Sequence, residues 1–259
     1  MARKLVDISV PLENDVPADP PFFRPKISYV DHRASVPQFL DSFPGLSKAE
    51  LPDGEGWAVE LVQLVTHNGT HVDAPYHYAS TMDKGRRAIT IDEVPLEWFF
   101  QPAVKLDFRH LPDGYVATAA DIEAELGRIH HELRPLEIVV VNTRAGLRYG
   151  SADYVNSGCG MGREATLYLL ERGVRVVGTD GWSWDAPFVY TIERYRQSRD
   201  ASIIWEGHRA GLEIGYCQIE KLHHLEALPA DGFSISCFPV KIRGASAGWT
   251  RAVAIWEEA

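Results

Sequence analysis

Hydrophobic positions along the chain form short β-branched runs that alternate with longer stretches of helical spacing. The apolar runs predict strands over residues 5–10, 58–65, 138–142, 174–178, 233–238 and 251–256. The run over residues 58–65 reads AVELVQLV, which indicates a buried strand. Helices are expected over residues 118–131, 162–172 and 218–223. Strands that alternate with helices predict one α/β domain with a mixed sheet, spanning residues 1–259.

Two of these helices have recognisable ends. Thr118 and Asp121 have the spacing of a capping box, which favours a helix start at this point. Gly173 follows the helix expected over residues 162–172, at the position where glycine commonly ends a helix.

The stretch from about residue 19 to residue 56 departs from this pattern. It is rich in proline and phenylalanine, and such a density of helix-breaking residues excludes long helices. The stretch therefore predicts an extended, loop-rich arm. Two interpretations remain open: a surface excursion, or an aromatic lid or dimer arm over a pocket.

Composition and charge exclude several classes of protein. The chain has 259 residues and a formal charge of −10 with no basic run, so nucleic-acid binding is not expected. The longest purely aliphatic run covers residues 138–141, far short of the roughly 20 residues that span a bilayer, so no membrane span is expected. No signal peptide is recognisable, and Cys159, Cys217 and Cys237 lie far apart, which fits a reducing cytoplasm.

The segment with the richest chemistry is THNGTHVDAPYH, residues 66–77. It holds three of the ten histidines and an aspartate, the ligand types that zinc and manganese accept. If residues 71–77 are extended, His71, Asp73 and His77 share one face. Gly69 can turn the chain so that His67 joins them. Four groups that handle metals or protons are therefore expected to converge.

Aromatic residues near this segment are candidates for a substrate pocket. Trp182 and Trp184 follow the strand expected over residues 174–178 and share a face if the chain stays extended. They and Tyr76 are candidate substrate-binding residues, the alternative being simple packing in the core. The chain lacks a G-x-S-x-G elbow, a P-loop and a dinucleotide fingerprint, so serine hydrolase and nucleotide-binding functions are not supported.

The histidine-rich segment resembles the H-x-G-T-H-x-D-x-P-x-H motif of the cyclase family of metal-dependent hydrolases, which includes bacterial kynurenine formamidases and isatin hydrolases. Residues 162–185 and the region around His208 and Glu220 are also similar to this family, so the resemblance covers about residues 57–257 and the first strand. It implies a swivelling β/β/α fold, a small-molecule substrate, and assembly as homodimers or homotetramers.

The resemblance also implies a role for each residue of the site. His67, His71 and Asp73 would bind a first divalent ion, Zn²⁺ or Mn²⁺. His77 would carry the proton during hydrolysis. His208 and Glu220 would hold a second ion, with Asp73 bridging, in those members that bind two.

Three functions remain open from the sequence. The leading hypothesis is a metal-dependent hydrolase that cleaves the C–N bond of an aryl formamide or a cyclic amide such as isatin. A lactone hydrolase or cyclase with the same site is the second. The third is a non-catalytic protein with a structural metal, against which His77 argues, because a structural site has no use for an additional histidine.

Overall fold

A nine-stranded mixed sheet forms the centre of this computed structural model, which describes residues 2–258. The strands lie in the order β1-β15-β13-β7-β9-β11-β12-β4-β14. Their bounds are β1 Ala2–Asp7, β4 His71–Asp73, β7 Phe100–Asp107, β9 Ile138–Asn142, β11 Val176–Thr179, β12 Cys217–Glu220, β13 Phe233–Ser236, β14 Ala247–Trp249 and β15 Val253–Glu258.

The middle of the sheet is parallel and its two sides are antiparallel. Strands β7, β9, β11 and β12 pair in parallel, whereas β4 and β14 on one side and β13, β15 and β1 on the other pair antiparallel. All five residues of β9 are buried, as expected for a strand covered on both faces. The predicted α/β class with a mixed sheet is confirmed.

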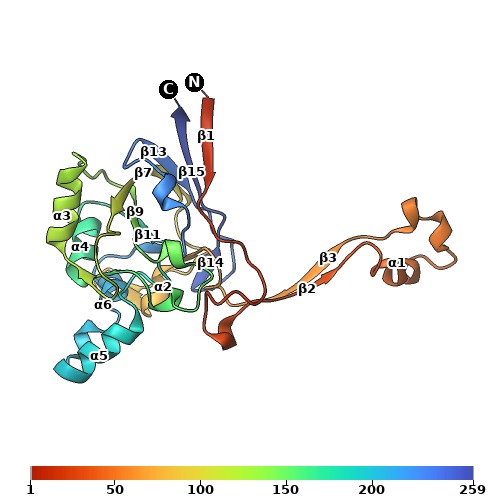
Figure 1. The fold of residues 1–259 in the computed structure, drawn as a ribbon, viewed down its shortest axis with the longest axis horizontal. Helices are drawn as coiled ribbons and strands as arrows, with labels where there is room; N and C mark the ends of the chain where they lie inside the picture. Colours follow the sequence, from red (N-terminus) through yellow and green to blue (C-terminus); the bar gives the residue numbers. More distant parts are fainter. Residues whose placement is uncertain (1, 259) are drawn as a thin grey trace.

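Helices α3 (Ala119–Arg128) and α4 (Arg163–Glu171) cover one face of the sheet (Figure 1). The predicted capping box is present at α3, where Thr118 Oγ1 accepts from the backbone N–H of Asp121 and the Asp121 carboxylate accepts from the Thr118 N–H. Gly173 has a φ of +89° just after α4, which explains the glycine at that helix end. The two predicted helices are therefore confirmed, slightly shorter than expected.

Two hydrophobic cores lie on opposite faces of the sheet. One lies between the sheet and helices α3 and α4. Its buried members include Ile122, Leu169 and Val139. The other fills the opposite face, with Val72, Ile138 and Ile219 among its members. Alternate residues of β9 belong to different cores, which fixes the register of the central strand.

The helix predicted over residues 218–223 is wrong, because the chain forms strand β12 there. Gln, Glu and Leu favour helices in isolation, but Cys217–Glu220 fills the gap between β11 and β4 and pairs through three of its residues with each of them. All four residues are buried. Tertiary pairing therefore overrides the local helical preference.

The prediction of a buried strand over residues 58–65 is only half right. A strand forms, β3 (Val59–Gln63), but all of its residues are exposed. It pairs only with β2 (Lys26–Val30), as a two-stranded ribbon separate from the main sheet. Apolar β-branched runs predict extended structure, but they do not distinguish a strand buried in its own chain from one that projects away from it.

This ribbon carries the chain away from the body, and residues 26–63 are called the arm below. Figure 1 shows the ribbon projecting from the body and ending in a small folded segment that contains α1 (Val36–Ser42). The remaining α-helices and strands are α2 Pro75–Tyr78, α5 Phe188–Ser198, α6 Glu206–Arg209, the short pair β5 Thr81–Met82 and β6 Arg86–Arg87, and the pair β8 Val116–Ala117 and β10 Gly160–Met161. None of the helices among the described residues is long and apolar enough to cross a membrane.

Candidate metal centre

The histidine-rich segment lies where the arm returns to the sheet, as a tight turn followed by β4. Gly69 has a φ of +57°, a conformation that glycine adopts without strain. Thr70 anchors the turn: its hydroxyl donates to the carbonyl of Lys221 at 2.6 Å and accepts from the N–H of Val10 at 2.9 Å. The turn is therefore held against β12 and the chain that follows β1.

The strand register brings three of the predicted ligands together. His71 and Asp73 alternate along β4 and so share a face, and Glu220 of β12 lies directly opposite His71. The Nε2 of His71 is 3.3 Å from Asp73 Oδ1 and 3.6 Å from Glu220 Oε2. The Nδ1 of His71 is 2.9 Å from the carbonyl oxygen of Gly69, which favours the tautomer with the proton on Nδ1. The lone pair of Nε2 is then directed toward the space between the two carboxylates.

His77 lies beside the same cluster, but the backbone that positions it is not extended as predicted. The extended conformation predicted over residues 71–77 ends at Asp73, and Pro75–Tyr78 forms a single helical turn, α2. Pro75 is the first residue of that turn, a position that proline tolerates well. The turn directs His77 back over the end of β4, where its ring centroid lies 4.1 Å from that of His67.

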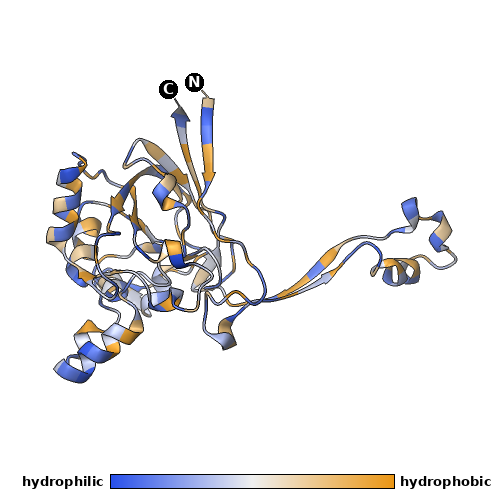
Figure 2. Ribbon diagram, in the orientation of Figure 1, coloured by the Kyte–Doolittle hydropathy of each residue, from blue (hydrophilic) through white to orange (hydrophobic). Residues whose placement is uncertain are grey.

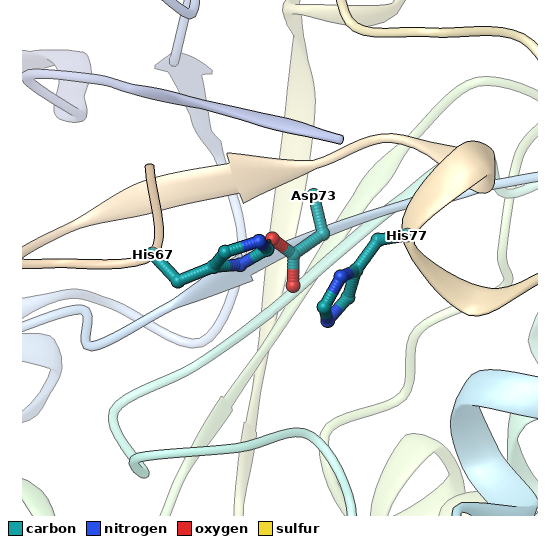
Figure 3. Close-up of side chains that lie close together, drawn as sticks. All are labelled: His67, Asp73 and His77. Atoms are coloured by element: carbon teal, nitrogen blue, oxygen red, sulfur yellow. Dashed lines mark ion pairs between the residues drawn. The ribbon is translucent and has the colours of Figure 1, made fainter. Parts of the chain in front are cut away.

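Asp73 is shared by two groups of candidate ligands. His67, Asp73 and His77 offer one atom each within 4.8 Å of one another, and so do His71, Asp73 and Glu220. Figure 3 shows the first group, with both imidazoles directed toward the Asp73 carboxylate. The Nδ1 of His67 is 2.8 Å from Asp73 Oδ1.

His208, on the short helix α6, closes the site from the other side. Asp185 holds it in place by accepting from the N–H groups of Gly207 and His208 and by lying 2.5 Å from His208 Nδ1. The Nε2 of His208 faces Glu220 Oε1 at 3.7 Å. A carboxylate on one ring nitrogen, with the other nitrogen directed at a shared site, is the usual arrangement around a metal-binding histidine.

The unsatisfied polar atoms of this cluster fit a divalent ion. Among the described residues, His71 Nε2 and both carboxylate oxygens of Asp73 are buried and make no well-directed hydrogen bond, although His67 Nδ1 lies 2.8 Å from Asp73 Oδ1. Burying a carboxylate whose charge is not compensated costs folding free energy, so a bound cation would stabilise these atoms. Imidazole nitrogen and carboxylate oxygen are the donors that Zn²⁺ and Mn²⁺ accept.

Electrostatics distinguish the two buried carboxyls. Burial by itself raises the pKa of Asp73, but His77, His71 and His67 outweigh burial and hold that pKa well below its ordinary value. Burial and the neighbouring Asp73 raise the pKa of Glu220. Burial lowers the pKa of His77 to about 4, with His67 and His208 adding to the effect, so His77 is a neutral imidazole at pH 7.

A cavity of about 370 Å³ opens directly onto this cluster. Its polar lining includes His67, His77, His208 and Glu220. The other walls are mainly apolar and aromatic, formed by Phe23, Val65, Trp182, Phe188 and Trp205. A largely apolar cavity with a few convergent polar groups is the usual form of a small-molecule site.

A buried ion pair supports the edge of the cavity. Lys221 donates to Asp19 Oδ1 and, at 2.8 Å, to the backbone carbonyl of His67. Asp19 also accepts from Trp182 Nε1 at 2.9 Å and from Asn68 Nδ2 at 3.0 Å. The pair therefore connects residue 19 to the turn that carries His67 and Asn68, and to the aromatic wall.

Of the predicted substrate-binding residues, the structure brings one to the cavity. Trp182 lines it. Trp184 is 1% exposed, donates from its indole nitrogen to Thr166 and packs in the core under α4. The side chain of Tyr76 is 47% exposed, and neither it nor Trp184 is among the described residues that line the cavity.

Three residues of the site were not predicted from the sequence. Asp185 orients His208, and only its place in the segment Trp182–Asp185 hinted at it. Lys221 follows a candidate ligand directly, but nothing in the sequence indicated that its ammonium group turns back under His67. Trp205 carried no signal at all: it stands between α5 and α6, and its ring lies against His208 only in the folded chain.

The fold and the cluster together define an α/β protein with a candidate divalent-metal centre on the neighbouring strands β4 and β12 of its sheet. The sequence family described as "Putative cyclase" matches residues 6–186, so the chain belongs to the Cyclase family. The family resemblance predicted from the histidine motif is confirmed.

Relatives and solved structures agree with this assignment. The kynurenine formamidase of Salinibacter ruber is 28% identical over 193 residues, which cover 74% of this chain and 77% of that protein. An isatin hydrolase bound to the product analogue thioisatinate superposes with a TM-score of 0.76 at 21% identity, covering 99% of this chain and 93% of the other. A predicted metal-dependent hydrolase from Bacillus stearothermophilus gives a TM-score of 0.65 at 19% identity, covering 99% and 100%. The structural similarities show a shared fold.

Proposed function

We propose that the chain is a metal-dependent hydrolase that cleaves the C–N bond of an aryl formamide or a cyclic amide. The observation that carries this proposal is the convergence of His67, His71, Asp73 and Glu220 at one end of an aromatic-walled cavity. The 28% identity to a kynurenine formamidase supports an amide as the substrate.

The residues of the site divide into a metal-binding set and a proton carrier. As the family resemblance implies, His67, His71 and Asp73 would bind one divalent ion, and Asp73, His208 and Glu220 would bind a second where two are present. The distances by themselves group Asp73 with His67 and His77, and with His71 and Glu220. Zinc and manganese are the proposed ions. A bound ion of this kind lowers the pKa of water toward about 7, which makes hydroxide available at neutral pH. It also polarises a substrate carbonyl.

His77 would move the proton. Its neutral imidazole faces the cavity and can accept the proton of the attacking water. The water oxygen bonds to the amide carbon, the C–N bond breaks, and the same proton passes from His77 to the leaving nitrogen. No covalent intermediate with the protein is needed.

The cavity walls would hold the aryl ring and exclude water. Trp182 and Trp205 present large aromatic surfaces beside the polar cluster, and Phe188 contacts the ring of Trp182 at a centroid distance of 5.8 Å. Apolar walls strengthen the interaction of the carbonyl with nearby charges, because few solvent dipoles remain to screen it.

Assembly and location are also proposals. We expect a homodimer or homotetramer, as the family resemblance implies. The three cysteines are buried and unpaired, which fits a reducing compartment such as the cytoplasm.

The test is a hydrolysis assay with three substrates: N-formylkynurenine, isatin and an aryl lactone. The protein is stripped of metal and reloaded with zinc or manganese, with Asp73→Asn as the matched control. The expected result is metal-dependent turnover of one of the two amides, with kcat/KM above about 10⁴ M⁻¹s⁻¹, the lower end for evolved enzymes. Turnover of the lactone alone would replace the amide proposal with the lactone one. No turnover by metal-loaded protein would overturn both.

A further inference from the structure

Lys221 is the one lysine or arginine among the described residues that line the cavity. Its side chain is 2% exposed, so the ammonium group is held away from bulk water. The cavity wall is largely hydrophobic, and Figure 2 shows the apolar first half of α5, which begins at the cavity residue Phe188. A charged donor in such surroundings needs a protein or ligand acceptor for each N–H group, because bulk water does not supply one.

The hydrogen bonds of this ammonium group use two of its three N–H groups. One N–H is donated to Asp19 Oδ1, and another is donated at 2.8 Å to the carbonyl oxygen of His67. Among the residues that the structure describes, no third acceptor bonds with the ammonium group. The remaining N–H is therefore available to a ligand in the cavity. The Nζ atom lies 5.9 Å from the ring centroid of Trp182, so a ligand that accepts this N–H would lie beside the indole.

Asp19 already neutralises the charge of Lys221 and is itself firmly held. Its Oδ1 also accepts from Trp182 Nε1 at 2.9 Å, and its Oδ2 accepts from Asn68 Nδ2 at 3.0 Å. An anionic ligand group that displaced Asp19 would break all three interactions. An anion that bound beside Asp19 would bring two carboxylates together where water screens their repulsion poorly. The free N–H therefore favours a neutral acceptor, such as a carbonyl oxygen, over a carboxylate.

We propose that Lys221 is a specificity-determining residue that donates its third N–H to an uncharged carbonyl oxygen on the aryl ring of the substrate. This oxygen is additional to that of the amide that is cleaved. Lys221 also binds the carbonyl of the proposed metal ligand His67, so the acceptor would lie close to the reacting amide. The substrate class is thereby narrowed to aryl amides with a neutral acceptor near the amide. The effect on catalysis rests on the proposed function, whereas the binding preference does not require turnover.

Three formamides with the same aryl ring test the binding preference. N-(2-acetylphenyl)formamide carries a neutral acceptor, formanilide carries none, and 2-formamidobenzoate carries an anionic one. By calorimetry, metal-stripped wild-type protein should bind the acetyl compound about 10-fold more tightly than either of the others, the effect of one hydrogen bond to a charged donor. Equal affinity for the acetyl compound and formanilide would overturn the proposal, as would tightest binding of the benzoate.

Kinetics of a variant show whether Lys221 is the cause of this preference. In metal-loaded protein, Lys221→Met should lower kcat/KM for the acetyl compound by about 10-fold more than for formanilide, mainly through KM. The variant also loses the bond to the His67 carbonyl, but that effect is common to both substrates and cancels in their ratio. Equal losses on both substrates would show that Lys221 only supports the turn, and would overturn the proposal.

The double variant Asp19→Asn with Lys221→Met repeats the comparison without a buried, unpaired carboxylate. It should show the same change in the ratio of the two substrates as Lys221→Met. An unchanged ratio in this variant would contradict the role of the ammonium group.

A second buried lysine provides the matched control. Lys105 is 8% exposed and donates to the carbonyl oxygens of Leu225 and Leu228, and it is not among the described residues that line the cavity. Lys105→Met should lower stability and leave the ratio of the two substrates unchanged. An equal change of the ratio in Lys105→Met and Lys221→Met would refute the specificity role. If the wild type hydrolyses none of the formamides, the hydrolase function fails, and calorimetry of wild type and Lys221→Met decides the acceptor preference.

Discussion

The indole of Trp205 stacks on the imidazole of His208, with ring centroids 4.6 Å apart and planes inclined by 10°. The same indole lies 5.3 Å from the ring of His77. Trp205 therefore contacts both the histidine proposed for metal binding and the one proposed for proton transfer, and it forms part of the cavity wall. Its backbone has a φ of +58°, which is strained for a bulky residue.

Two variants at position 205 test whether this backbone conformation is strained. Trp205→Ala and Trp205→Gly both remove the ring and should raise KM by about 10-fold or more. Glycine adopts a φ of +58° freely, so the glycine variant should be more stable than the alanine variant by about 1 kcal/mol. Urea unfolding and steady-state kinetics measure the two effects. An alanine variant as stable as the glycine variant would argue against backbone strain.

His77 should be required for turnover but not for metal binding. A positioned acid–base group is worth about 10²- to 10⁴-fold, so His77→Ala should lose at least 10² in kcat and retain its metal. His71→Ala is the comparison, and it should lose metal and activity together. Elemental analysis of both proteins distinguishes the roles. If His77→Ala loses its metal as well, His77 belongs to the ligand group with His67 and Asp73.

The Lys221–Asp19 ion pair should act as one unit. Lys221→Met leaves the buried Asp19 carboxylate without its cation and removes a donor to the His67 carbonyl, so it should cost about 3–5 kcal/mol of unfolding free energy. Asp19→Asn combined with Lys221→Met should recover part of that loss. A double-mutant cycle in urea measures the coupling, and strictly additive effects would contradict the pairing.

Asp180 should make stability depend on pH. Burial raises its pKa to about 7, although Thr143 donates to its carboxylate from both N–H and hydroxyl. Because the folded-state pKa lies above the unfolded value of about 3.9, its contribution to stability is complete below pH 4 and is lost as pH rises through 7. The unfolding free energy of the wild type, relative to Asp180→Asn, should fall by about 1.4 kcal/mol per pH unit from pH 4 to 7, then level off. A constant difference across that range would refute the raised pKa.

The sequence predicted what is local and missed what depends on tertiary contacts. His67, His71, Asp73 and His77 lie within one short segment, so their convergence could be inferred from turn chemistry and family resemblance, although His77 arrives on a helical turn rather than an extended strand. Glu220 was placed on a helix, and its true position opposite His71 depends on β12 pairing with β4, which residue preferences do not encode. Trp205 and Lys221 are distant from the motif in sequence and join the site only through folding.

Asp73 is the residue proposed to bind the ion on which catalysis depends. The most direct measurement is metal content and amide hydrolysis, determined together, for wild-type protein and for Asp73→Asn across a zinc or manganese titration. Wild-type activity should rise in proportion to bound metal, while Asp73→Asn should bind little metal and stay inactive. Hydrolysis by metal-stripped wild type, or full activity in Asp73→Asn, would contradict it.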